Sequence, residues 1–170
     1  MQRASERAAT LAASGAPPLP PRWHYAPDLT LREARALYFE RAGFDERGYA
    51  ERWVTLRVFG RPWLGFPNTQ ARIRAVRLHD LHHVLTGYDT SWAGEGEIGA
   101  WELATNCRDH YAAWWLNFSA ADIALWFAPR RVVAAFRRGL RERNLYDVAF
   151  SDALLDERVG AMRARLGIAQ

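Results

Sequence analysis

The chain has 170 residues, of which 49% are apolar and 25% charged, a balance typical of a soluble globular domain. Its 23 basic and 19 acidic residues leave a net charge of +4. All the basic residues are arginine, but no nucleic-acid-binding motif accompanies them, so we expect no nucleic-acid partner. The single cysteine, Cys107, excludes an internal disulfide, and its helical context predicts a buried, unreactive thiol.

The first 22 residues are rich in Ala, Ser and Pro and lack the apolar stretch of a secretory signal. We predict that residues 1–22 form a disordered leader and that residues 23–170 form a single helical domain. The most apolar segment, residues 111–129, is interrupted by Asn117, Ser119 and Asp122, so no membrane-spanning helix is expected.

Beyond the leader, the apolar pattern predicts an all-α fold, a single-domain helical bundle. Thr30 and Glu33 match a capping box, and Asp45, Asn68 and Ser151 are further N-cap candidates. A turn rich in Gly and Pro is expected over residues 60–68, where no strand alternation is evident. The predicted helices cover residues 30–43, 45–58, 68–85, 94–116, 130–144 and 151–167.

The third of these helices carries the motif His79-Asp80-x-x-His83. Residues four apart on an α-helix lie one above the other, so the two imidazoles can share one ion. Asp80 is about 60° from His83 around the helix, on a stripe with Val76 and Val84 where an unpartnered carboxylate would be costly. Ordinary packed histidines are the alternative, and Asp80 makes a bound cation the favoured interpretation.

A helix-ending Gly87 and a polar loop then lead to Glu95 at the start of the next helix, which predicts a metal site between two central helices. Two imidazoles with one or two carboxylates suit Zn, Fe(II) or Mn and leave coordination positions open for water or substrate. The predicted ligands are His79, His83 and Glu95, with Asp80 as the fourth ligand or as a partner that orients a histidine.

The string H-D-x-x-H, followed by eleven residues and Glu, resembles the motif of the ubiquinone (coenzyme Q) biosynthesis protein family named Coq protein four. The sequence HVLTGYDTSWAGE around it is similar to that family's consensus, and the closing ERVGAMRARLGI resembles its C-terminal helix. The resemblance covers roughly residues 70 to 168. It implies that His79, Asp80, His83 and Glu95 hold a divalent metal.

The resemblance also implies an enzyme that binds a polyprenylated hydroxybenzoate precursor and replaces its carboxyl group at ring carbon one by hydroxyl. The same four residues, His79, Asp80, His83 and Glu95, would then be catalytic. Other ubiquinone-biosynthesis proteins and the inner-membrane surface are the implied partners, on the cytoplasmic side in a bacterium or the matrix side in a mitochondrion. A homodimer is left open.

Other acidic residues and histidines leave alternatives near this motif. A two-residue shift would make Glu97 the ligand, but the ungapped register favours Glu95. Glu102 and Asp109 follow Glu95 at intervals of seven, and a solvated face is the favoured interpretation for both. The alternative for Glu102 is an acceptor for a ligand N–H or a substrate contact. The remaining histidines are expected at the surface or hydrogen-bonded rather than bound to metal: His24, His82 and His110.

Eight tryptophans are a high number for 170 residues, and several aromatic residues gather at 114–127. Core packing explains most of them, and the functional alternative is an apolar pocket for a prenyl tail. In the next helix an apolar stripe is surrounded by arginines, a pattern typical of a helix on an anionic membrane, of a headgroup site or of a solvated bundle helix. The stripe comprises Val132, Val133, Phe136 and Leu140, and the arginines are Arg130, Arg131, Arg137, Arg138 and Arg141.

Two further function classes compete with the decarboxylase. One is a non-catalytic organiser in which the ion ties helices together and the protein presents lipid intermediates to other enzymes. A metal-dependent phosphohydrolase of the HD type is the other, suggested by the pair His79-Asp80, although it requires additional His and Asp ligands from other helices.

Overall fold

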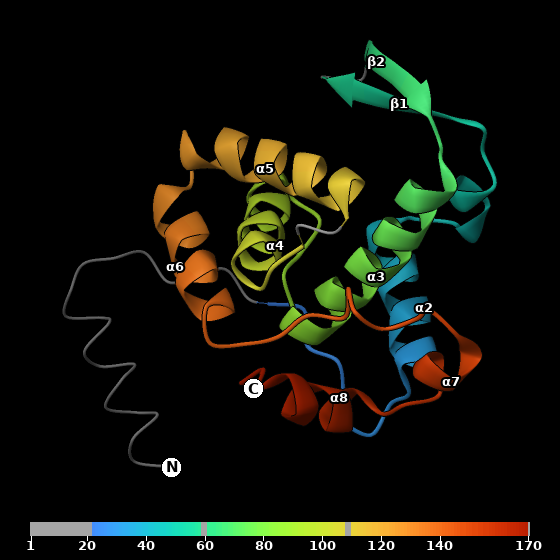
Figure 1. Ribbon diagram of the computed structural model, residues 1–170, viewed down its shortest axis with the longest axis vertical. Helices are drawn as coiled ribbons and strands as arrows, with labels where there is room; N and C mark the ends of the chain where they lie inside the picture. Colours follow the sequence, from blue (N-terminus) through green and yellow to red (C-terminus); the bar gives the residue numbers. More distant parts are fainter. Residues whose placement is uncertain (1–21, 59–60, 108–109, 170) are drawn as a thin grey trace.

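The computed structural model describes residues 22–58, 61–107 and 110–169, so nearly all of the predicted leader lies outside the described residues. Helices pack around one hydrophobic core, and the predicted all-α bundle is confirmed (Figure 1). The helices are α2 (Leu31–Ala42), α3 (Gln70–Thr86), α4 (Trp92–Ala104), α5 (Tyr111–Leu125), α6 (Pro129–Gly139), α7 (Asp152–Leu155) and α8 (Val159–Leu166).

Helix α2 begins and ends as its sequence predicts. The Thr30 side chain accepts a hydrogen bond from the Glu33 amide, the Glu33 carboxylate accepts one from the Thr30 amide, and Gly43 ends the helix with φ of 68°. These contacts satisfy backbone groups that a helix end leaves without intrahelical partners.

The predicted helix over 45–58 and the turn over 60–68 are wrong. Asp45 caps only a short 3-10 helix, η1 (Glu46–Tyr49), and the chain then forms an antiparallel hairpin of β1 (Trp53–Val58) and β2 (Arg61–Pro67). This hairpin extends away from the helices in Figure 1. Its pairing register shifts within β1, between residues 56 and 57. The sequence of β1 alternates, but β2 contains Pro62, Gly65 and Pro67, which are unfavourable in strands and predict a turn instead.

Two predicted helices are each interrupted. The one expected over 94–116 is divided into α4 and α5 because the chain turns at Asn106, which adopts a left-handed φ of 78°. The last one is divided into α7, capped by Ser151, and α8, which Gly167 ends. Cys107 is buried, as predicted.

Close helix packing depends on glycines in α4, which lies against both α5 and α6. A Cβ atom on Gly96 would lie 2.1 Å from the Cβ of Ala124, and one on Gly99 would lie 2.6 Å from the carbonyl oxygen of Asn117. Since both distances are far below contact, only glycine allows α5 to approach this closely. The approach places Asn117 beside the interior face of α4.

Helix α3 begins after Thr69, one residue later than predicted, and ends at Gly87 with φ of 80°. Its C-terminal end is held by Arg163 of α8, whose guanidinium donates to the carbonyl oxygens of Val84, Leu85 and Tyr25. A cation at this end also compensates the negative end of the helix dipole. Among the described residues, no helix is both long enough and apolar enough to cross a membrane.

Candidate metal centre

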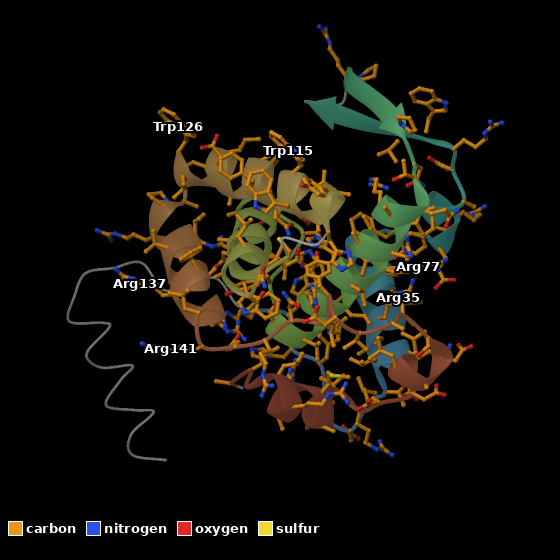
Figure 2. The ribbon with its side chains drawn as sticks, in the orientation of Figure 1. Arg35, Arg77, Trp115, Trp126, Arg137 and Arg141 are labelled. Carbon is orange, nitrogen blue, oxygen red and sulfur yellow. The ribbon has the colours of Figure 1, made fainter. Side chains whose placement is uncertain are left out.

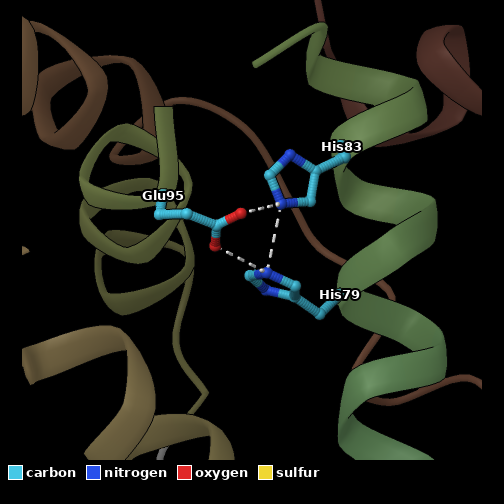
Figure 3. A group of neighbouring side chains, drawn as sticks. All are labelled: His79, His83 and Glu95. Carbon is cyan, nitrogen blue, oxygen red and sulfur yellow. Dashed lines mark hydrogen bonds and ion pairs between the residues drawn. The ribbon is translucent and has the colours of Figure 1, made fainter. Parts of the chain in front are cut away.

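Two histidines of α3 and one glutamate of α4 converge at the centre of the bundle (Figure 3). The Nε2 atoms of His79 and His83 lie 3.1 Å apart. One carboxylate oxygen of Glu95 is 3.5 Å from Nε2 of His79, and the other is 3.5 Å from Nε2 of His83. The three predicted ligands therefore meet between two central helices and could hold an ion, with one ligand atom from each residue within 4.8 Å of the others.

The site is open on one side. The His83 side chain is fully buried, whereas those of His79 and Glu95 are 20% and 34% exposed. Glu95 reaches the histidines because it lies in the first turn of α4, four residues after the N-cap Ser91. Three protein ligands with an accessible edge leave room for water or a substrate group, as in catalytic metal sites.

His83 presents a lone pair to the other two ligands. Its Nδ1 atom is 2.9 Å from the carbonyl oxygen of Tyr88, which can only accept a hydrogen bond. Nδ1 therefore carries the proton, and Nε2 of the neutral ring is left as an acceptor or metal ligand. The ring also stacks on Tyr38, with centroids 5.3 Å apart, which fixes its plane.

His79 is oriented in the same way by a carboxylate. Its Nδ1 atom is 3.0 Å from Oε1 of Glu102, so Nδ1–H donates and Nε2 faces His83. Two neutral imidazoles arranged like this would direct their lone pairs at one another across 3.1 Å, so a cation must lie between them: a proton on Nε2 of His79, whose pKa is raised, or a metal ion. Two nitrogens bound at about 2.1 Å to one tetrahedral zinc are separated by about 3.4 Å, so the donor set fits a divalent ion.

Glu102 is completely buried and accepts from four donors. His79 and His82 donate to Oε1, while the Tyr146 hydroxyl, at 2.6 Å, and the Asn117 amide donate to Oε2. The favoured expectation of a solvated face is therefore wrong for Glu102, which instead accepts a ring N–H of His79, as the alternative predicts.

His82 is a buried, hydrogen-bonded histidine, one of the two environments predicted for it. Its Nε2 atom accepts the backbone N–H of Leu145 at 2.9 Å, which leaves Nδ1–H to donate to Glu102 at 2.5 Å. The ring therefore has no lone pair left for a metal. His24 is exposed, and His110 lies beside the Tyr146 carbonyl oxygen at 2.9 Å, so both match the prediction as well.

Asp80 does not join the ligand group. Its buried carboxylate accepts a short hydrogen bond from the hydroxyl of Tyr49, which in turn accepts one from Arg35. The structure thus supplies the partner that the buried carboxylate requires, and this partner is a tyrosine rather than the ion. Asp80 and Tyr49 line a cleft of about 570 Å³ between α2, η1 and α3.

The choice between Glu95 and Glu97 is decided by direction. Glu97 is turned away from the histidines and forms an ion pair with Arg131 of α6. Glu95 faces both imidazoles, as the ungapped register predicts. Asp109 lies outside the described residues.

The charges at the centre depend on one another. Burial disfavours ionised Glu95 and Glu102, but hydrogen bonds and charge interactions with the histidines outweigh it and lower the pKa of both carboxyls, that of Glu102 well below its usual range. Burial also disfavours protonated His79, yet Glu102 and Glu95 raise the pKa of this imidazole well above its usual range. The two carboxylates therefore favour a cation in this pocket.

A second feature of interest is an apolar groove of about 480 Å³ between α4, α5 and α6. Its lining includes Leu103, Phe118, Leu125, Val132, Phe136 and Leu140. Beside it, exposed aromatic side chains continue along α5, with Trp115 61% and Trp126 87% exposed, and both point away from the bundle in Figure 2. Core packing therefore does not account for these two residues.

The arginines of α6 and of the residues just after it divide into two groups. Arg137 and Arg141 point outward in Figure 2, and Arg130 is also exposed. Arg131 and Arg138 instead bind carboxylates of the bundle, Glu97 and Glu142. Only the first group therefore borders the apolar surface in the way the sequence predicts for all five.

In comparisons with known proteins, no family model, no curated protein and no solved structure matches this chain. The chemistry of the site is therefore judged from its own residues. Two imidazole nitrogens and one carboxylate form a mixed N/O set on one side of an ion, a combination used for Zn and for Fe(II) with open positions.

Proposed function

We propose that this protein is a metal-dependent enzyme whose divalent ion is held by His79, His83 and Glu95. The observation that carries the proposal is the pair of Nε2 atoms 3.1 Å apart, each on a ring whose Nδ1 atom is already committed as a donor. The accessible edge at His79 and Glu95 favours catalysis over a purely structural ion.

Together with the sequence resemblance, this site favours oxidative decarboxylation of a polyprenylated hydroxybenzoate in ubiquinone biosynthesis. A bound Zn, Fe or Mn ion would supply positive charge for a substrate carboxylate or phenolate, and Fe or Mn would also offer a position for dioxygen. His79, His83 and Glu95 hold and orient the ion, and the buried ring of His83 and its Tyr38 neighbour shield one side of it from water.

In this proposal, two surfaces of the protein suit the prenyl tail of the substrate and the membrane. The groove between α4, α5 and α6 is almost entirely apolar and suits a prenyl chain. The exposed aromatic residues of α5 and the outward arginines of α6 suit contact with an anionic membrane surface, where other enzymes of the same pathway would meet the protein.

The organiser alternative rests on the fact that the ligands join α3 to α4. A structural ion usually has four protein ligands, whereas three are brought together among the described residues. The phosphohydrolase alternative has less support, because Asp80 of the His79-Asp80 pair is engaged by Tyr49.

The deciding experiment is complementation of a quinone-deficient strain that lacks the resembled family. Wild type, Glu95→Ala and Glu97→Ala are compared at matched expression, and accumulated lipids are identified by mass spectrometry. Loss of rescue only with Glu95→Ala, together with a still-carboxylated precursor, would support the enzyme. Rescue by both variants would favour the organiser, and no rescue by wild type would count against the pathway.

A further inference from the structure

Among the described residues, Glu102 is the only fully buried carboxylate in direct contact with the proposed metal site. Two ring nitrogens, one amide and one hydroxyl surround its two oxygens. An ionised carboxylate accepts hydrogen bonds from all four groups, whereas a protonated one would need one of them to accept instead, so the geometry favours the ionised form. The negative charge then has no contact with solvent.

None of its partners brings a full compensating charge once the ion is bound. Asn117 and Tyr146 are neutral, His82 is neutral because its Nε2 accepts from Leu145, and His79 is neutral when its Nε2 binds an ion. An isolated buried carboxylate is strongly unfavourable. A divalent ion on the far side of the His79 ring, together with Glu95, brings the total charge of the cluster to zero.

We propose that Glu102 is a positioning residue for the metal: it holds His79 with Nε2 toward the ion and supplies the second negative charge that a buried divalent ion needs. This inference rests on the proposed metal site and concerns a residue outside the ligand set. Mutation of a residue that hydrogen-bonds a metal-bound histidine commonly weakens metal binding by about 10–100-fold, so Glu102→Gln should weaken zinc binding by about that factor.

Three other elements hold the Glu102 carboxylate in place. Asn117 reaches it from α5, His82 from α3, and Tyr146 from the segment between α6 and α7. His82 is itself fixed by the Leu145 amide. Because the carboxylate is held from several sides, it keeps its position whether or not His79 has bound an ion, and the site is organised in advance.

The test is a thermodynamic cycle with zinc alone. Zinc affinity is measured by chelator competition, and the zinc-induced rise in melting temperature is measured for wild type and Glu102→Gln. The expected result is a 10–100-fold weaker affinity and a smaller zinc-induced rise for Glu102→Gln. A merely structural role would lower the melting temperature of the zinc-free protein and leave the zinc-induced rise unchanged, which would overturn the proposal.

Glu142→Gln is the matched control. Glu142 is also a carboxylate with little exposure, but it accepts from Trp101 and Arg138 and does not touch a ligand. We expect this variant to lose stability without a change in zinc affinity. An equal loss of affinity in both variants would assign the effect to general loosening and reject a specific role for Glu102.

If Glu102→Gln does not fold, Tyr146→Phe provides the second variant. It removes one donor that holds the carboxylate but retains the charge and the contact with His79, so a reduction of zinc affinity of a few-fold is expected. Unchanged affinity in this variant would count against the proposal. Failure of wild type to bind zinc would reject the metal site itself, whereas normal binding in wild type and Glu102→Gln alike would reject only the role of Glu102.

Discussion

At the scale of single residues, the Nδ1 atoms of His79 and His83 determine how these two side chains are oriented in the centre of the protein. The Tyr88 carbonyl oxygen and the Glu102 carboxylate each occupy an Nδ1 atom, so both Nε2 atoms of the pair are directed inward. With both Nδ1 atoms occupied, the two Nε2 atoms can share a cation, which is a proton on His79 in the ion-free protein and the metal ion in the proposed site.

His83→Ala is predicted to lose bound zinc while keeping most of its helix content, because it removes one of three ligands but leaves the hydrogen bonds of the α3 backbone. Metal analysis of the purified protein and far-ultraviolet circular dichroism measure the two effects. A variant that unfolded globally, or that retained one zinc per chain, would contradict the assignment.

Zinc affinity should rise with pH through the raised pKa of His79, because a proton and the ion compete for the same Nε2 atom. The sign for the zinc-free protein is opposite. A histidine whose pKa is raised in the folded state stabilises the fold below its unfolded pKa, and this stability is lost as pH rises through the folded value. Chelator competition and thermal unfolding between pH 5 and 9 measure both trends, and a pH-independent affinity would contradict them.

Part of this site could be predicted from sequence, since the spacing of His79 and His83 and the helix-start position of Glu95 are local properties. Asp80 was predicted to be a ligand because the sequence did not reveal the hydrogen-bond partner of its carboxylate. That partner is Tyr49, which lies in a segment that was predicted to be an α-helix and forms η1 instead. Tyr146 was missed because it reaches Glu102 across 44 residues of chain. No local pattern contains such a contact.

At the scale of elements, the helices with strong caps were predicted well and the irregular segments were not. Thr30 with Glu33, Pro129 and Gly167 mark helix boundaries by local chemistry. The break between α4 and α5 depends on Asn106 in a left-handed conformation, which asparagine adopts only in a suitable tertiary setting. The hairpin was missed because Pro62, Gly65 and Pro67 of β2 are typical of a turn and unfavourable in a strand.

Gly99→Ala tests the packing that connects these elements. The added Cβ would lie 2.6 Å from the Asn117 carbonyl oxygen, so α5 must move away from α4. We expect a loss of about 1–3 kcal/mol in the free energy of unfolding, as for other overpacked positions. Zinc affinity should fall as well, because Asn117 is displaced from Glu102.

Denaturant unfolding and chelator competition measure these two effects. Ala134→Gly, at an exposed position of α6, controls for a small change in helix propensity without a steric clash. Stability and affinity equal to wild type in Gly99→Ala would show that the close approach of the two helices is not needed.

At the scale of the whole molecule, the metal centre and the apolar surface share α4 but face different neighbours. Glu95 and Glu102 of α4 meet α3, while Leu103 of the same helix lines the groove toward α5 and α6. A single helix thus connects the proposed reactive centre with the proposed tail site. The interior of the bundle contains the buried polar side chains, whereas exposed aromatic side chains lie on its outer face.

The outward arginines should make membrane binding depend on charge. We predict that the protein binds vesicles containing anionic lipid and that replacing both Arg137 and Arg141 by Glu weakens binding by at least tenfold, since each arginine contributes about 1 kcal/mol near such a surface. Vesicle sedimentation at low and high salt measures this effect. Binding that is equal for neutral and anionic vesicles would contradict it.

Arg163 joins parts of the chain that are far apart in sequence, because a single guanidinium holds the last turn of the metal-bearing helix and the backbone at Tyr25. Lysine, with a compact ammonium group, could not span three carbonyl oxygens arranged in this way. The end of α3 therefore cannot fray on its own: opening it also releases the N-terminal segment and α8. Opening of the chain near the histidines therefore requires these elements to open together. A metal ion that enters or leaves the proposed site would then encounter histidines held in one arrangement.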